Sequence, residues 1–192
     1  MTADWIQQID GGITLAINSL HFESGDYLWQ LFSLKEAWYP LYALVVFYTF
    51  RRLGWKNGGI MVVAMVLTIV ACDQFANLIK DGVGRLRPCY NEALISKGLH
   101  ILEGRGSFFG FFSAHAANAF GFAMSSTISF KTDKSHRYVK YQWFIFIWSA
   151  MVGISRVFAG KHFFGDVMTG TCVGLIFGWA IAKAGVWLTD KV

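Results

Sequence analysis

The run Met61-Val-Val-Ala-Met-Val-Leu-Thr-Ile-Val-Ala71 is almost continuously apolar. It lies at the centre of a segment, residues 58–80, that is long enough to cross the roughly 30 Å hydrocarbon core of a bilayer as an α-helix. The last turns of this segment carry Asp73, Asn77 and Lys80, whose spacing places all three on one helix face. Polar residues within a membrane helix normally face the bundle interior and mark a functional site.

The composition of the whole chain indicates an integral membrane protein. Of the 192 residues, 55% are hydrophobic, 17% are aromatic and only 15% are charged, and the mean hydropathy is +0.43. A soluble domain usually has fewer apolar and more charged residues. The length predicts one domain, residues 1–192. The three cysteines have no metal-type spacing.

The predicted fold class is all-α, a polytopic membrane helix bundle of five or six transmembrane helices with an N-terminal amphipathic segment. Apolar runs predict spans at about 37–53, 58–80, 111–130, 141–156 and 164–187. Residues 1–34 are expected to form an interfacial segment, with a short or re-entrant span through 27–34 as the alternative, before a catalytic bundle at 35–192. Small residues at near-i+4 spacing predict a packing face on the last span; they are Gly165, Gly170, Gly174, Gly178 and Ala182.

The basic residues between the spans predict the orientation. Arg51, Arg52 and Lys56 follow the first span and the cluster Lys131–Lys140 follows the third, so both groups lie on one side of the membrane. The positive-inside rule makes that side cytoplasmic. The loop at 81–110 and the turn after residue 156 then share the external face. The positive-inside rule does not explain the basic residues on this external face, whereas binding of an anion would explain them.

Polar residues gather at this external face in a pattern suited to phosphoryl transfer. His162 and Asp166 are four residues apart, so the carboxylate can fix the imidazole tautomer and leave the other nitrogen free to attack phosphorus. Lys80, Arg87 and Arg156 supply positive charge for phosphate oxygens. Any one of these residues alone would more often be an interfacial or snorkelling side chain. Their conjunction at one face favours a site.

Two further residues complete the expected chemistry. His115 is the remaining titratable candidate for protonating the leaving alkoxide. Ser113, near a helix N-terminus, can donate its hydroxyl or its backbone N–H to phosphoryl oxygens.

The pattern Lys80-x6-Arg87-Pro88, then Ser113-Ala-His115, then Ser155-Arg156-x5-His162-x3-Asp166 resembles the three-part signature of the type 2 phosphatidic acid phosphatase superfamily. The first and third parts match without gaps. The second part departs from the usual Pro-Ser-Gly-His, because Phe112 replaces the proline and Ala114 the glycine. This departure puts the backbone donor at Ser113 in question.

The resemblance implies a metal-independent lipid phosphatase without a cofactor. In that interpretation His162 is the nucleophile that forms a phosphohistidine, Asp166 orients it, and His115 is the general acid. The residues that the resemblance assigns to phosphate binding are Lys80, Arg87, Ser113, Ala114, Arg156 and Ser155.

Other polar residues near these motifs have two interpretations. Arg85, Tyr90, Glu103 and Arg105 lie in the external loop, where they would either contact the substrate head group or be solvated loop residues. Asp73 and Asn77 are expected to brace Lys80. Lys161 would either add positive potential beside the nucleophile or face water.

The expected substrate is an amphiphilic lipid phosphate: undecaprenyl diphosphate, a lipid A phosphate, or phosphatidylglycerophosphate or phosphatidate. An active site facing the periplasm from a bacterial inner membrane favours the first two. Expected partners are this lipid and the bilayer, with no nucleic acid, and the sequence does not give the oligomeric state. The alternatives are a lipid phosphotransferase, a non-catalytic lipid-binding protein, and a vanadium haloperoxidase, which would be larger and soluble.

Overall fold

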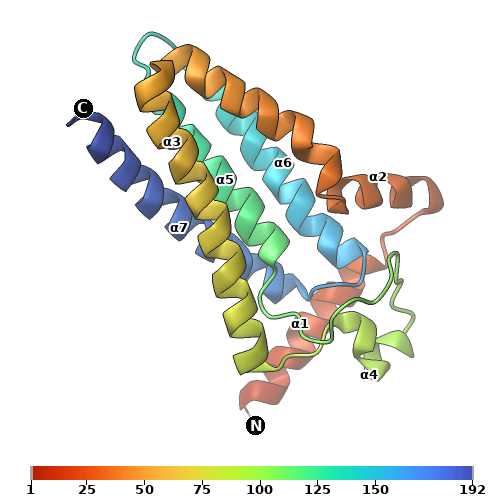
Figure 1. Ribbon diagram of the computed structural model, residues 1–192. Coiled ribbons are helices and arrows are strands. Elements are labelled where there is room, and N and C mark those ends of the chain that lie inside the picture. Colours follow the sequence, from red (N-terminus) through yellow and green to blue (C-terminus); the bar gives the residue numbers. More distant parts are fainter. Residues whose placement is uncertain (1, 192) are drawn as a thin grey trace.

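The computed structural model describes residues 2–191, and within this range the regular structure is helical (Figure 1). An isolated β-bridge between Leu86 and Phe109 joins the two ends of the long loop. The prediction of an all-α protein is therefore confirmed. The helices are α1 (Thr2–Asn18), α2 (Glu23–Ser33), η1 (Glu36–Trp38), α3 (Tyr39–Val83), η2 (Pro88–Tyr90), α4 (Glu92–Ile95), α5 (Ala114–Lys131), α6 (Val139–Phe158) and α7 (Phe164–Thr189).

Helix α3 consists of two arms that fold back on each other at Gly54. Gly54 has φ 76° and ψ 173°, a conformation that glycine adopts at little cost. The arms correspond to the predicted spans 37–53 and 58–80, and α5, α6 and α7 correspond to the other three. Figure 1 shows the two arms of α3 diverging from their bend, with α5 and α6 lying between them in this view.

By length and apolar composition alone, Glu36–Val83 and Phe164–Thr189 are long enough to cross a bilayer. Helix α2 has 11 residues, about 16 Å of helix, which is too short to span. The exact number of spans stays a prediction.

The α5–α7 contact brings two helix backbones together. A Cβ at Gly170, Gly174 or Gly178 would lie only 2.3–2.5 Å from the nearest carbonyl oxygen of α5. Such distances leave no room for any side chain, so glycine is required at all three positions. The predicted small-residue packing face is confirmed, and it holds α5 in a fixed register against α7. The facing carbonyls belong to Ser113, Ala117 and Gly121.

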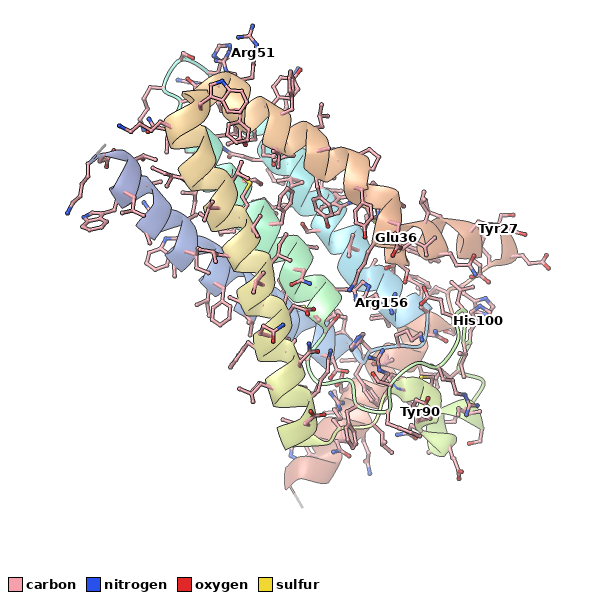
Figure 2. All side chains as sticks on the ribbon, viewed as in Figure 1. Tyr27, Glu36, Arg51, Tyr90, His100 and Arg156 are labelled. Carbon is pink, nitrogen blue, oxygen red and sulfur yellow. The ribbon has the colours of Figure 1, made fainter. Side chains whose placement is uncertain are left out.

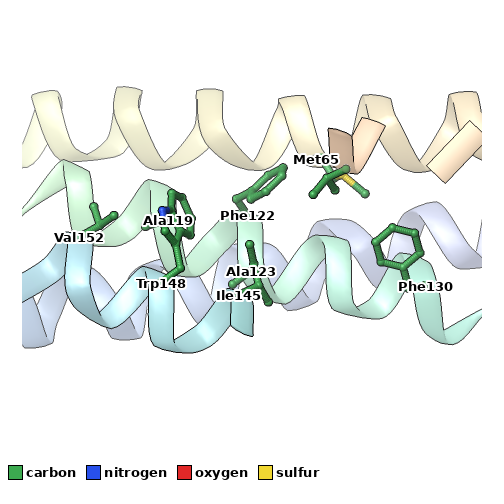
Figure 3. Close-up of a cluster of buried hydrophobic side chains, with 9 residues drawn as sticks. Met65, Ala119, Phe122, Ala123, Phe130, Ile145, Trp148 and Val152 are labelled. Carbon is green, nitrogen blue, oxygen red and sulfur yellow. The ribbon is translucent and has the colours of Figure 1, made fainter. Parts of the chain in front are cut away.

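On its other side α5 packs through large side chains against α3 and α6. Figure 3 shows this cluster, in which Phe122 and Trp148 lie between the helices. Aromatic rings meet edge to face here, with 4.8 Å between the centroids of Tyr42 and Phe122 and 5.5 Å between those of Trp38 and Trp148. Bulky side chains therefore keep these helices farther apart than α5 and α7.

Hydrogen bonds join distant segments of the chain at each end of the bundle. At one end Arg52 donates to Asp133 at 2.9 Å and to the Tyr138 hydroxyl at 3.0 Å, which ties the α3 bend to the α5–α6 loop. At the other end the Cys89 N–H donates to the Gly160 carbonyl at 3.1 Å, so the long loop meets the α6–α7 turn. The predicted grouping of the loops at two ends is confirmed. Which end faces the periplasm stays a prediction.

Helix α1 lies across the end of the bundle that carries the long loop and presents two different faces (Figure 1). Trp5, Ile6, Ile9 and Ile13 are 41–56% exposed and form an unpartnered apolar face. This face agrees with the predicted interfacial segment.

The opposite face of α1 is polar and docks on the bundle. Thr14 accepts a hydrogen bond from the Phe164 N–H at 3.0 Å, and Asn18 donates to the Val157 and Phe158 carbonyls, both at 3.0 Å. Helix α1 is therefore fixed to the α6–α7 turn by specific hydrogen bonds.

Candidate active site

The predicted histidine nucleophile lies in the short turn between α6 and α7. Gly160, at φ 68°, reverses the chain after α6, and a Cβ there would lie 2.9 Å from the His100 carbonyl. The turn buries Lys161 and His162, which are 5% and 2% exposed, and Asp166 in the first turn of α7 is fully buried. Figure 2 shows Arg156, from the last turn of α6, within the molecule, whereas Tyr90 and His100 lie in the loop region.

His162 and Asp166 face each other as the sequence predicts. The His162 Nδ1 atom lies 3.6 Å from Asp166 Oδ2, and this nitrogen is buried without a hydrogen-bond partner. Burial lowers the pKa of His162 to about 4; Asp166 opposes this effect, while Arg156 and Arg87 add to it. The imidazole is therefore neutral near pH 7, as a nitrogen nucleophile must be.

The Asp166 carboxylate is held by contacts on both oxygens. Oδ2 accepts from the Phe163 N–H at 3.0 Å, and Oδ1 accepts from Arg85 at 2.6 Å. The same guanidinium donates to Asp10 of α1 at 2.6 Å and lies 3.9 Å from the centre of the Phe163 ring. Arg85 is thus occupied by the protein's own carboxylates, which differs from the expected contact with a lipid head group.

Three cations converge beneath one segment of the long loop, residues 103–109. Arg87 donates to the Ser107 hydroxyl at 2.9 Å, Arg156 lies 3.4 Å from both Glu103 oxygens, and Lys161 donates to the Gly104 carbonyl. Burial lowers the pKa values of Arg87 and Lys161, because both cations have lost part of their hydration. Partly desolvated cations favour an anion strongly. Lys161 is buried in this group and does not face water.

Lys80 lies at the end of the polar face of α3. Its ammonium is 3.4 Å from the Asn77 side-chain oxygen, and the Asn77 amide is 3.4 Å from Asp73. The predicted bracing of Lys80 by these two residues is confirmed.

The start of α5 supplies fewer backbone donors than the sequence suggests. The Ser113 N–H donates to the Asp166 carbonyl at 3.0 Å, so only the Ser113 hydroxyl is open to a ligand. That hydroxyl accepts from the Ala116 N–H at 3.4 Å and caps the helix, which leaves its own proton free. Ala114 is the first helical residue, where N–H groups point out of the helix end. The Ser155 hydroxyl is buried and donates to the Val152 carbonyl at 2.8 Å.

His115 belongs to the same group of charges. It is half-buried in the first turn of α5 and interacts electrostatically with His162, Arg156 and Lys80. Lys35, the residue just before η1, is a further electrostatic neighbour that sequence reasoning did not include. The three motifs, which are spread over residues 80–166, therefore meet at one end of the bundle.

Residues 57–190 match the model of the PAP2 superfamily, the type 2 phosphatidic acid phosphatases. The chain belongs to this superfamily. The resemblance drawn from the three motifs is thereby confirmed.

Relatives and solved structures agree with this assignment. The lipid A 4'-phosphatase of Bacteroides thetaiotaomicron is 34% identical over 92% of this chain and 76% of that protein. The lipid A 4'-phosphatase of Porphyromonas gingivalis is 28% identical over 98% and 78%. The predicted enzyme class, a lipid phosphatase, is confirmed.

Two crystal structures share the fold. A transmembrane PAP2 type phosphatidylglycerolphosphate phosphatase from Bacillus subtilis has a TM-score of 0.72 and 21% identity over 97% of this chain and 87% of that one. Aquifex aeolicus LpxE has a TM-score of 0.64 and 21% identity over 90% and 93%. With its apolar helices, this PAP2 chain is a membrane protein.

Outside the cations of the PAP2 site, Tyr90 and Arg105 form a small patch on the long loop. The Tyr90 hydroxyl donates to the Gly106 carbonyl at 2.7 Å, and the Arg105 guanidinium lies 5.7 Å from the centre of the Tyr90 ring. A head-group contact from this patch stays a prediction.

Among residues 2–191, the group with donor atoms close enough to share a metal ion is His21, Asp26 and His100, whose ligand atoms lie within 4.8 Å of one another. Asp26 already pairs with His100 at 2.9 Å. None of the three is a motif residue of the PAP2 site.

Sequence reasoning missed the part that α1 takes in the PAP2 site. Asp10 accepts from Arg85 and from the Gly165 N–H at 2.8 Å, so it stabilises the first turn of α7 that carries Asp166. The signal was present as polar residues at positions 10, 14 and 18, which share one helix face. The same helix also carries an apolar face, which by itself predicts an interfacial segment.

Proposed function

We propose that this PAP2 enzyme removes the 4'-phosphate of lipid A. The observation that carries the proposal is the 34% identity to the Bacteroides thetaiotaomicron lipid A 4'-phosphatase, which extends over 92% of this chain. The same activity is named for the Porphyromonas gingivalis relative.

In the proposed mechanism the neutral His162 attacks the phosphorus through Nε2. A P–N bond forms as the bond between phosphorus and the sugar oxygen breaks, and Asp166 stabilises the positive charge that develops on the imidazole. Support comes from the 3.6 Å approach of Asp166 to Nδ1 and from the burial that keeps the ring unprotonated. Water then attacks the phosphohistidine and releases inorganic phosphate.

His115 is proposed to donate a proton to the leaving sugar oxygen and then to accept one from the attacking water. Arg87, Arg156 and Lys80, with the Ser113 hydroxyl, would hold the phosphoryl oxygens as negative charge increases in the transition state. Because Glu103 occupies Arg156 without substrate, the loop segment 103–109 must yield when phosphate enters. No step requires a metal ion.

We further propose that the site faces the periplasm from the inner membrane, with five spans formed by the two arms of α3 and by α5, α6 and α7. The cations at the α3 bend and the α5–α6 loop then lie in the cytoplasm, as the positive-inside rule expects. Lipid A phosphates in the outer leaflet would reach the opposite end of the bundle.

The test is release of phosphate from purified lipid A in detergent with EDTA. The wild type should yield lipid A that has lost only the 4'-phosphate, identified by mass spectrometry. His162→Ala should lower kcat at least 10³-fold, because the nucleophile is gone. His136→Ala, which alters a half-exposed histidine at the opposite end of the bundle, is the matched control and should keep full activity.

Three results would overturn the proposal. One is hydrolysis of the 1-phosphate instead of the 4'-phosphate, and another is a fully active His162→Ala enzyme. The third is transfer of the phosphoryl group to an added acceptor lipid with no release of inorganic phosphate, which would indicate a phosphotransferase.

A further inference from the structure

A cavity of about 410 Å³ lies between the α2–α3 junction, the second arm of α3, α5 and α6. Its lining includes the aromatic residues Trp38, Tyr42 and Trp148 and the charged residues Lys35 and Asp73. His115, which interacts electrostatically with His162, lines the cavity as well. The cavity therefore adjoins the place where the leaving oxygen of the substrate must lie.

This cavity contains polar atoms that the protein leaves without hydrogen bonds. Among the described residues, eleven buried side-chain polar atoms have no hydrogen-bond partner, and four of them belong to residues that line this cavity. Ser33 and Trp148 are only 5% and 4% exposed. The four atoms are Ser33 Oγ, Trp38 Nε1, Asn118 Oδ1 and Trp148 Nε1.

An unpaired buried polar atom destabilises the folded state, so native proteins keep few of them. Their gathering around one cavity indicates that a ligand supplies the missing partners. An entirely apolar ligand would leave all four unpaired.

The kinds of atom define the ligand chemistry. An indole N–H only donates, so Trp38 and Trp148 require acceptors such as carbonyl oxygens. The carboxamide of Asn118 accepts through its oxygen and suits an N–H or O–H donor, and the Ser33 hydroxyl can do either. Among the other lining residues, Phe32, Ile69 and Val152 suit hydrocarbon, whereas Lys35 and Asp73 add charge to the wall. The matching ligand is thus an acyl chain joined through an amide or ester, with an N–H or hydroxyl nearby.

We propose that this cavity binds the acyl linkage of the substrate while the phosphate lies at His162. The proposal rests on the proposed function and deepens it, because it makes acylated lipid phosphates the substrate class. A prenyl phosphate has no carbonyl, amide or hydroxyl group along its chain. Such a lipid would fill the cavity with hydrocarbon and leave the two tryptophan N–H groups unpaired.

The experiment compares two substrates that differ only in the linkage. One is a sugar phosphate with an ester-linked acyl chain, and the other is the same sugar phosphate with an ether-linked alkyl chain of the same length, which lacks the carbonyl group. The variants Trp38→Phe and Trp148→Phe remove the N–H donors and keep the ring. We expect the ratio of kcat/KM for the acylated substrate over the alkyl substrate to fall about 10-fold for each variant, mainly through KM.

Trp29→Phe is the matched control. The Trp29 N–H is also buried without a partner, but its ring stacks on Phe158 at 4.1 Å and does not line the cavity. Its loss should leave the ratio unchanged. A thermal unfolding curve for each variant excludes a fold defect as the cause of a change.

Binding to His162→Ala protein, measured by calorimetry, separates the two proposals. If the wild type hydrolyses neither substrate, the proposed function fails, yet tighter binding of the acylated lipid that is lost in Trp38→Phe and Trp148→Phe would still support the cavity proposal. If the acylated lipid is hydrolysed but the tryptophan variants keep the wild-type ratio and affinity, the cavity proposal is overturned while the proposed function stands.

Discussion

The two sides of α5 differ in how closely the neighbouring helices approach. Towards α7 there is no room for one methyl group, since a Cβ at Gly174 would lie 2.3 Å from the Ala117 carbonyl. Towards α3 and α6 there is a cavity of about 410 Å³. Because Ser113 caps α5 and His115 lies in its first turn, the tight side holds these proposed catalytic residues near α7, while the proposed site of the acyl linkage lies on the open side. One helix thus serves rigidity and access at once.

The largest effect is expected from breaking the tight side with Gly174→Leu. The added side chain must overlap the α5 backbone, so we expect no folded, monodisperse protein and no activity, as measured by size-exclusion chromatography in detergent and by thermal unfolding. On the open side, Val152→Phe adds a large group next to the cavity and should keep the protein folded. Equal stability of the two variants would contradict the contrast.

A smaller effect is expected from Arg85, which connects Asp10 of α1 to Asp166 of α7. Arg85→Lys keeps the charge but loses the bridge between Asp10 and Asp166, so we expect kcat to fall about 10- to 100-fold with little change in KM. A positioning role predicts the same pattern for Asp10→Asn. If either variant instead raised KM for lipid A with kcat unchanged, Arg85 would be a head-group contact after all.

The smallest expected effect is a lowered titration midpoint of His162, which can be measured on the wild-type protein. Burial on the tight side lowers the pKa of His162 to about 4, so its imidazole should titrate well below the usual 6.5. The unfolded chain takes up this proton first, hence the contribution of His162 to stability is full above about pH 6.5 and is lost as the pH falls towards 4. ¹⁵N NMR of labelled histidines, with His162→Asn for assignment, measures the midpoint. A midpoint near 6.5 would contradict the burial argument.

Much of this arrangement follows from local sequence patterns. Apolar runs predicted the five long helical segments, the glycine spacing predicted a packing face on α7 but not its partner α5, and the three motifs predicted which residues meet. Each of these rests on a periodicity or a spacing within a few turns of chain. The sharp bend at Gly54 between the two arms of α3 is a detail that the separate spans only implied.

Local sequence patterns do not predict contacts between distant segments of the chain. That Arg85 would turn towards Asp10 and Asp166, or that the Ser113 N–H would be taken by the Asp166 carbonyl, depends on where distant segments dock. The cavity is likewise invisible in the sequence, because Ser33, Trp38, Asn118 and Trp148 share no motif and come from four different elements or their junctions. Only packing reveals that their polar atoms lack partners.

The hydrogen bonds of α1 to α7 have a consequence for biosynthesis. Thr14 and Asp10 bond to residues 150 and 155 positions later in the chain, so the ribosome must deliver the α6–α7 turn before the first helix can find its place. Until then Asp10 lacks the start of α7, although Arg85 is already in the chain. Helix α1 is therefore made before the segment that completes its contacts, and a chain that stops short of α7 leaves Thr14 and Asp10 without these partners.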